Sequence, residues 1–197
     1  MNNECASAVV WRRLRYMLSP QFDLYESIAK KLGAMKRPPT VLEVGFGTGA
    51  GVVQYAPFVA RVDAIEVDEE AVKFAEKCFP LPNVNWELRS ITDGVPKDAY
   101  EIVVMVETLE HIRKWPKALD NIYDALVYGG ELIMTARNAN ADLRRESQYH
   151  EREWTAQELT YALGKWFDDI WLYDWTLLNL QSSETTITPL ISVARKS

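Results

Sequence analysis

A short apolar stretch that runs into alternating glycines constrains this chain more than any other part of its sequence. Residues 41–44 are mostly apolar and β-branched, which is typical of a strand buried in a parallel sheet. Gly45, Gly47 and Gly49 follow directly. Glycines at these positions let the backbone take left-handed conformations and approach a ligand where a Cβ would clash. The sequence therefore predicts a sharp turn after the first strand, with a bound molecule beside it.

A second apolar stretch, residues 61–67, contains an acid near its end, Glu66. In doubly wound sheets, a carboxylate at the end of the second strand commonly accepts hydrogen bonds from the ribose hydroxyls of a nucleoside. The glycine turn and Glu66 together predict a nucleoside-containing cofactor.

The spacing of the glycines separates two kinds of cofactor. A dinucleotide-binding turn has the pattern Gly-x-Gly-x-x-Gly. Read from Gly45, its last position falls on Ala50, which such turns sometimes accept; read from Gly47, it falls on Val52, which they do not. With Glu43 in front, the alternating glycines instead resemble the first motif of the class I S-adenosylmethionine (SAM)-dependent methyltransferases. We therefore expect SAM rather than NAD.

Strand and helix patterns alternate through the middle of the chain, which predicts an α/β fold. We expect a doubly wound, Rossmann-like, mostly parallel seven-stranded sheet with an antiparallel C-terminal hairpin. The predicted strands are 40–44, 61–67, 84–88, 100–106 and 131–136, with 170–180 and 185–194 as the hairpin. The predicted helices are 52–58, 69–79, 116–127, which the glycines at 129–130 would stop, and 155–167, which a Thr155–Glu158 capping box would begin.

The length of 197 residues suits one domain, 1–197. Apolar residues recur at helical intervals on both sides of the Ser19-Pro20 step, which predicts two short helices within residues 6–36. In the methyltransferase family such helices lie over the cofactor, so the resemblance implies that 1–36 is an N-terminal helical lid. Basic and aromatic residues at 11–16 are either a solvated helix face or a site for an anionic substrate.

The resemblance also implies which residues contact the cofactor. The glycine turn would pass along the methionine part, Glu66 would bind the ribose hydroxyls, and Val67 would line the adenine. The family often has an Asp after the third strand, where this chain has Ser90 and Ile91, with Asp93 as an alternative. The predicted cofactor contacts are Glu43, Gly45, Gly47, Gly49, Glu66, Val67, Ser90, Ile91 and Glu107.

Acidic residues and a histidine follow the predicted fourth strand. Glu107, Glu110 and His111 are three or four residues apart or adjacent, so a helical turn would place them close together. The second histidine, His150, follows the fifth strand and therefore lies at the same carboxyl edge of a parallel sheet. Carboxylates and imidazoles suit a divalent cation. The predicted metal ligands are Glu107, Glu110, His111 and His150.

These segments resemble two methyltransferase groups, the small-RNA terminal 2′-O-methyltransferases and the ubiquinone-pathway O-methyltransferases. Both have Glu-x-x-Glu-His after the fourth strand, as at 107–111, and the RNA group has a histidine before Glu-Trp-Thr, as His150 precedes 153–155. The resemblance implies Mg²⁺ or Mn²⁺, which would bind the acceptor hydroxyl and lower its pKa.

A second interpretation of the same residues needs no metal. Many small methyltransferases have Leu-Glu-His at this place with a histidine that only packs. The catalytic prediction is then that His111 or His150 is a general base, since imidazole titrates near neutral pH. Either route predicts methylation of oxygen.

The net charge of the chain indicates which class of acceptor molecule to expect. The formal net charge of −6 opposes approach to nucleic-acid phosphates. A small-molecule acceptor, such as a sugar, phenol or natural product, is therefore favoured over an RNA end. A SAM-binding paralogue without catalytic activity is the third hypothesis. The sequence does not identify the acceptor or the oligomeric state.

The expected cellular location depends on two patterns that the sequence does not contain. No apolar run approaches the roughly 20 residues that span a bilayer, and the N-terminus shows no signal pattern. We therefore expect a cytoplasmic protein with no membrane partner. Cys5 and Cys78 lie far apart without metal-ligand spacing, so we expect free thiols.

Overall fold

The computed structural model describes residues 20–141, 148–173 and 189–197. The chain divides into two compact units, Met1–Ser90 and Ile91–Ser197. The prediction of one domain over 1–197 stays a prediction. Residues 1–19, with Cys5, the basic residues at 11–16 and the first predicted lid helix, lie outside the described residues.

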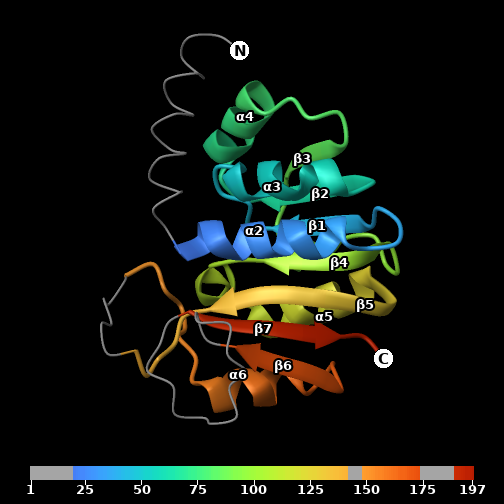
Figure 1. The fold of residues 1–197 in the computed structure, drawn as a ribbon. Coiled ribbons are helices and arrows are strands. Elements are labelled where there is room, and N and C mark those ends of the chain that lie inside the picture. The colour runs from blue at the N-terminus through green and yellow to red at the C-terminus, as the bar shows by residue number, and fades with distance from the viewer. Residues whose placement is uncertain (1–19, 142–147, 174–188) are drawn as a thin grey trace. The chain divides into compact units, whose positions relative to one another are not determined.

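The first unit contains three parallel strands with helices in front of them (Figure 1). Its strand order is β3-β2-β1. The elements are α2 (Pro20–Gly33), β1 (Thr40–Val44), α3 (Ala50–Tyr55), η1 (Ala56–Phe58), β2 (Arg61–Glu66), α4 (Glu69–Cys78) and β3 (Val84–Leu88). The β-branched and aliphatic residues of β1 and β2 form its core, since Val41, Leu42, Val62 and Ile65 are at most 1% exposed.

Helices α3 and α4 begin and end within three residues of the predicted bounds 52–58 and 69–79. Proline is tolerated in the first turn of a helix, and α2 begins at Pro20. The Asp68 side chain accepts a hydrogen bond from the Glu70 N–H and caps α4. Helix α3 ends before Pro57, and its last residues continue as the 3₁₀ turn η1.

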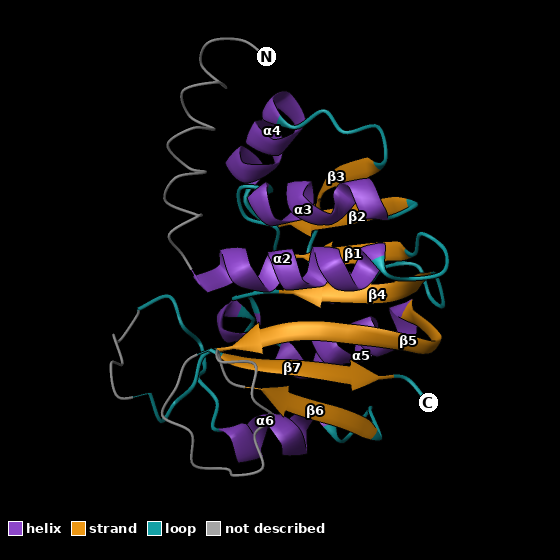
Figure 2. Ribbon diagram, in the orientation of Figure 1, coloured by secondary structure: helices purple, strands orange, loops and turns teal. Residues whose placement is uncertain are grey.

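The second unit contains four strands in the order β4-β5-β7-β6. Strands β4 and β5 are parallel, whereas β7 is antiparallel to both β5 and β6 (Figure 2). Its elements are η2 (Ile91–Asp93), β4 (Tyr100–Met105), η3 (Leu109–His111), α5 (Trp115–Ala125), β5 (Leu126–Ala136), α6 (Ala156–Leu163), β6 (Asp169–Tyr173) and β7 (Leu190–Arg195). The antiparallel pairing at the C-terminus confirms the predicted hairpin.

One predicted boundary is wrong. Helix α5 ends at Ala125, and Leu126 is already extended, so the glycines at 129–130 lie inside β5 instead of stopping the helix. Gly129 has a φ of 79°, and the β4–β5 register shifts between Tyr100 and Ile102. Here glycine allows an irregularity within a strand. The same glycine pattern in a sequence also occurs where a helix stops.

The capping box at the start of α6 is confirmed. The Thr155 side chain accepts from the Glu158 N–H, and the Glu158 carboxylate accepts from the Thr155 N–H. The helix ends at Leu163, four residues before the predicted end at Phe167. Strand β6 is described from Asp169 to Tyr173 and β7 from Leu190 to Arg195, and the predicted strand residues among 174–188 lie outside the described part of the chain.

The structure bears on the expectations for the cysteines and for membrane-spanning segments. Cys78 is disulfide-bonded, so the expectation that its thiol is free is wrong. Within the described residues, the structure contains no helix that is both long and apolar enough to span a membrane.

A fully buried acid on β1 joins the strand to two helices. Glu43 is 0% exposed, and its carboxyl oxygens accept hydrogen bonds from the hydroxyls of Tyr25 on α2, at 2.5 Å, and Tyr55 on α3, at 2.8 Å. Burial raises the pKa of Glu43 to about 8, and the two tyrosine hydrogen bonds oppose this shift only in part. The packing of α2 and α3 on β1 therefore encloses a carboxyl group that is neutral at pH 7.

Replacement of Glu43 by Gln tests this assignment. Because the folded pKa of about 8 exceeds the ordinary 4.5, the free energy of unfolding should fall as pH rises between these values, by up to roughly 1.4 kcal/mol per pH unit. Glutamine keeps a donor and an acceptor but does not titrate. Glu43→Gln should therefore gain stability relative to wild type as pH rises from about 5 to about 8 in urea unfolding. Exposed Glu76→Gln is the control, and an equal difference from wild type at both pH values would contradict the assignment.

Candidate functional site

The glycine turn of the first unit has the backbone conformation that its sequence predicts. Gly45, Gly47 and Gly49 have φ values of 74°, 54° and 80°, a region that favours glycine. The Gly45 N–H donates to the Ile65 carbonyl at 2.9 Å, which ties the start of the turn to β2. The turn is therefore held between two neighbouring strands at their carboxyl ends.

A Cβ has different consequences at two of these glycines. At Gly49 it would lie 2.9 Å from the Trp86 ring, so this glycine is needed for packing. At Gly47 an added Cβ would meet no atom within 4 Å. The backbone at Gly47 is consequently accessible to a ligand, and packing alone does not explain a glycine there.

Glu66 lies directly beside this turn. One carboxylate oxygen accepts from the Gly47 N–H at 2.9 Å, and the other accepts from the N–H groups of Val67 and Asp68 at 2.7 and 3.2 Å. The structure thus brings together the glycines and the acid predicted to bind a nucleoside. Three backbone hydrogen bonds fix the carboxylate at the end of β2.

Two exposed apolar side chains follow at the same edge. Val67, predicted to line the adenine, is 69% exposed, and Leu88 is 52% exposed. Leu88 ends β3 and is the register partner of Glu66. Apolar side chains left in water at strand ends suit a flat ring. The sequence analysis missed Leu88, although its place at the end of the third strand was predicted.

Glu43, Ser90 and Ile91 are three further predicted cofactor contacts. Glu43 is enclosed by its two tyrosines and supports the turn from within the core. Ser90 ends the first unit, whereas Ile91 begins the second, where it is 3% exposed and its carbonyl accepts from Asn121 at 2.6 Å. Their contacts with a cofactor stay predictions.

The second unit brings together three of the four predicted metal ligands. Glu110, His111 and His150 each offer a ligand atom, and these atoms lie within 4.8 Å of one another. The 3₁₀ turn η3 positions the first two after β4, and the rings of His111 and His150 are 5.1 Å apart, centroid to centroid. We call these three residues the Glu-His cluster.

Both imidazoles are oriented through their Nδ1 atoms. His111 Nδ1 lies 2.9 Å from the Tyr149 carbonyl oxygen, and His150 Nδ1 lies 3.0 Å from a carboxylate oxygen of Glu153. A carbonyl or an ionised carboxylate can only accept, so Nδ1 is the donor in each contact, and in a neutral imidazole Nε2 then keeps its lone pair. This is the arrangement that orients histidines as metal ligands.

Glu110 supplies the carboxylate of the cluster. It is 1% exposed, and neither of its carboxylate oxygens accepts a hydrogen bond from another residue. Burial, followed by the nearby charge of Glu107, raises the pKa of Glu110 to about 8. A buried carboxylate without donors is costly in its charged form, and a cation would remove that cost. The cluster therefore fits a divalent metal.

Glu107 is not part of the cluster. Thr135 Oγ1 accepts from the Glu107 N–H at 2.7 Å and donates to its carboxylate at 3.1 Å. Glu107 has a φ of 50°, which is unusual for a residue with a side chain and is stabilised by this pair of hydrogen bonds. Burial raises the pKa of Glu107, and the charge of Arg137 opposes that shift.

The segment that carries His150 is fastened to η3 by its backbone. The N–H groups of Glu151 and Arg152 donate to the Glu110 carbonyl at 2.7 and 3.3 Å. Arg113 adds a two-pronged ion pair to Glu151, at 2.9 and 3.1 Å. These contacts join residues about forty positions apart in the chain and hold the two histidines in place.

Comparison with known proteins shows to which family the chain belongs. A family model described as "Methyltransferase domain" matches residues 11–181. Methyltransferase str2 of Strobilurus tenacellus is 27% identical over 138 residues, which are 66% of this chain and 46% of that protein. The chain spans 46% and 27% of the lengths of the first two curated relatives that it matches.

Solved structures show the same fold. The N-methyltransferase NodS from Bradyrhizobium japonicum, in complex with S-adenosyl-L-homocysteine, superposes with a TM-score of 0.65 at 20% identity, covering 87% of this chain and 85% of that one. A possible histamine N-methyltransferase from Thermotoga maritima gives 0.67 at 19% identity, covering 98% and 99%. They confirm the predicted α/β fold, a mostly parallel seven-stranded Rossmann-like sheet. Because the family model covers most of its length, the chain belongs to the methyltransferase domain family.

Proposed function

We propose that the protein transfers the methyl group of SAM to a hydroxyl oxygen of a small molecule, with a divalent cation, Mg²⁺ or Mn²⁺, held by the Glu-His cluster. The observation that carries this proposal is the convergence of the Glu110 carboxylate with a ring nitrogen of each of two histidines, all within 4.8 Å. The family membership supports SAM as the methyl donor.

The first unit supports the cofactor part. Its turn offers backbone at Gly47 where no side chain intervenes, beside the fixed carboxylate of Glu66 and the apolar side chains of Val67 and Leu88. A methionine chain, a ribose and an adenine ring need these three kinds of surface. SAM itself supplies an activated methyl group, so the protein mainly has to bind, align and exclude water.

The second unit supports the acceptor part. A hydroxyl is a weak nucleophile, and a cation bound to it lowers its pKa. Glu110, His111 and His150 would bind that cation, while Tyr149 and Glu153 hold the rings. If no cation binds, the Nε2 atom of either histidine can accept the hydroxyl proton through its lone pair.

Two other acceptors are weighed against this one. The resemblance of the His150 segment to RNA-end methyltransferases supports a ribose 2′-hydroxyl, although a net charge of −6 opposes RNA binding. The names of NodS and the Thermotoga protein point to nitrogen acceptors in those proteins. A domain that binds SAM without turnover is the remaining alternative.

Gly47→Ala tests the cofactor site. The positive φ makes alanine cost about 1–2 kcal/mol of stability, but the added Cβ meets no protein atom. We expect a folded protein whose affinity for SAM by calorimetry falls by about tenfold or more, because the Cβ enters the ligand's space. Gly129→Ala is the matched control, with the same backbone strain and open surroundings within β5. Equal SAM affinity in both variants would remove Gly47 from the site.

Titration with Mn²⁺ tests the Glu-His cluster. Glu110→Gln should abolish measurable binding, because the amide keeps the shape but loses the charge that binds a cation. Glu153→Gln should weaken binding by about 10- to 100-fold, since its carboxylate only orients His150.

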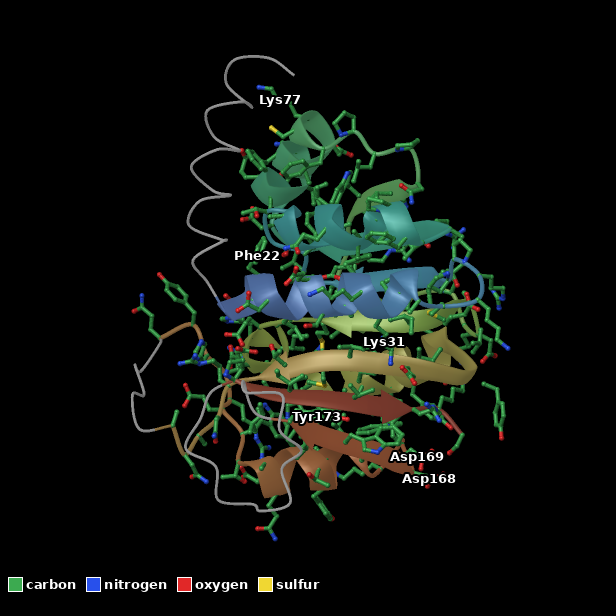
Figure 3. The ribbon with its side chains drawn as sticks, viewed as in Figure 1. Phe22, Lys31, Lys77, Asp168, Asp169 and Tyr173 are labelled. Atoms are coloured by element: carbon green, nitrogen blue, oxygen red, sulfur yellow. The ribbon has the colours of Figure 1, made fainter. Side chains whose placement is uncertain are left out.

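The control for this titration is Asp169→Asn. Asp169 is exposed and begins β6, directly after Asp168, and the strand's other end is Tyr173 (Figure 3). Through β7 it pairs with the Glu131 end of β5, away from the Glu-His cluster. Identical Mn²⁺ curves for wild type and Glu110→Gln would show that the cluster holds no metal.

The acceptor atom is identified by the product. Wild-type protein with methyl-labelled SAM and pooled metabolites should yield a labelled methyl ether, identified by mass spectrometry and NMR. Chelation of divalent metal should reduce its formation, and Mn²⁺ should restore it. Label found only on nitrogen would overturn the hydroxyl proposal. Binding of SAM without any transfer would identify the non-catalytic alternative.

A further inference from the structure

Arg137 follows the last residue of β5 and has an unusual environment. The residue is half-buried and its Nε is fully enclosed, yet its guanidinium makes no hydrogen bond or ion pair with any residue that the structure describes. A guanidinium is charged at every accessible pH, and an enclosed N–H without an acceptor is costly. Such a group points to a ligand that supplies the missing acceptors.

The backbone of Arg137 is held in place. Its carbonyl accepts from the Trp154 N–H at 2.9 Å, and the Trp154 carbonyl accepts from the Ala139 N–H at 2.9 Å. Trp154 is 0% exposed and belongs to the segment that carries His150. The backbone of Arg137 is thus joined to the same segment that brings His150 to the Glu-His cluster.

Arg137 lies near the acids of the site without pairing with them. Its charge opposes the raised pKa values of both Glu107 and Glu110, which places the guanidinium within electrostatic range of each. Glu107 is instead bound by Thr135. The terminal N–H groups of the Arg137 guanidinium therefore stay available to a ligand.

From this position we propose that Arg137 binds an anionic group, a carboxylate or a phosphate, of the acceptor molecule. The inference rests on the proposed function, and it narrows the substrate class to hydroxylated molecules whose anionic group lies close to the methylated hydroxyl. Arginine suits this role because its planar fork matches the oxygens of carboxylate and phosphate.

The charges of the site are compatible with an anion once a cation is bound. Glu107, Glu110 and Glu153 bring three carboxylates to the site, which by themselves would repel an anion. A divalent cation and Arg137 together bring three positive charges. An anionic acceptor group would then meet no net repulsion.

To test this inference, the protein is incubated with methyl-labelled SAM and a metabolite extract, and the labelled products are passed over an anion exchanger. The main labelled product of the wild-type protein should be retained on the exchanger. For that acceptor, Arg137→Gln should raise KM by about tenfold or more with a smaller change in kcat, and Arg137→Lys should be intermediate. Affinity for S-adenosylhomocysteine, measured by calorimetry, should not change in Arg137→Gln. Arg195→Gln is the control, because Arg195 ends β7 and pairs with Glu131, far from the Ala136 end of β5 that Arg137 follows.

Each contrary result has a distinct meaning. A neutral main product, or an unchanged KM in Arg137→Gln, overturns the inference while a methyl ether product keeps the proposed function. Label on nitrogen of an anionic acceptor, with KM dependent on Arg137, supports the inference and overturns the hydroxyl proposal. Loss of S-adenosylhomocysteine affinity with no change in the acceptor's KM would mean that the guanidinium binds the cofactor's carboxylate, which also overturns the inference.

Discussion

The cost of burying a carboxylate governs the chemistry of this protein. Glu43 and Glu110 are both almost completely enclosed, and each has its pKa raised to about 8 by burial. Glu43 receives two tyrosine hydrogen bonds and so belongs to the core. Glu107 receives one from Thr135. Glu110 receives none from another residue. Of these three acids, only Glu110 is left for a partner that the protein does not itself supply.

The partner that Glu110 lacks is defined by what surrounds it. Two imidazoles lie next to the carboxylate, and their Nδ1 atoms contact the Tyr149 carbonyl and the Glu153 carboxylate. A ligand atom of each of the three groups lies within 4.8 Å of the other two. Hydrogen-bond acceptors gathered without a donor stabilise a positive charge between them. The docking of residues 148–154 onto η3 creates this arrangement, since neither segment has it alone.

The sequence predicted those features that depend on local pattern. The glycine turn, the acid at the end of β2 and most strand boundaries follow from hydrophobic runs and residue spacing, and the structure confirms them to within a residue or two. The α5–β5 boundary was wrong because Gly129 has the same local signature in a helix stop and in an irregular strand.

The features that the sequence analysis missed depend on contacts between distant segments. Glu43 fits a cofactor motif, and its enclosure by Tyr25 and Tyr55 depends on how α2 and α3 pack. Glu153 and Arg137 acquire their roles only when the His150 segment docks. For Glu153 the sequence held one signal, its position three residues after His150. For Arg137 it held none.

The chemistry of the Glu-His cluster separates oxygen from nitrogen acceptors. An amine attacks SAM only as the neutral base, yet three converging acceptors would stabilise its protonated form and raise its pKa, which disfavours reaction. A hydroxyl has the opposite need, because its reactivity increases as its proton is lost. A cation held by the same three groups lowers the pKa of a bound hydroxyl. With a cation bound, the cluster would assist a hydroxyl, which is why we propose an oxygen acceptor, whereas the names of similar structures point to nitrogen acceptors in those proteins.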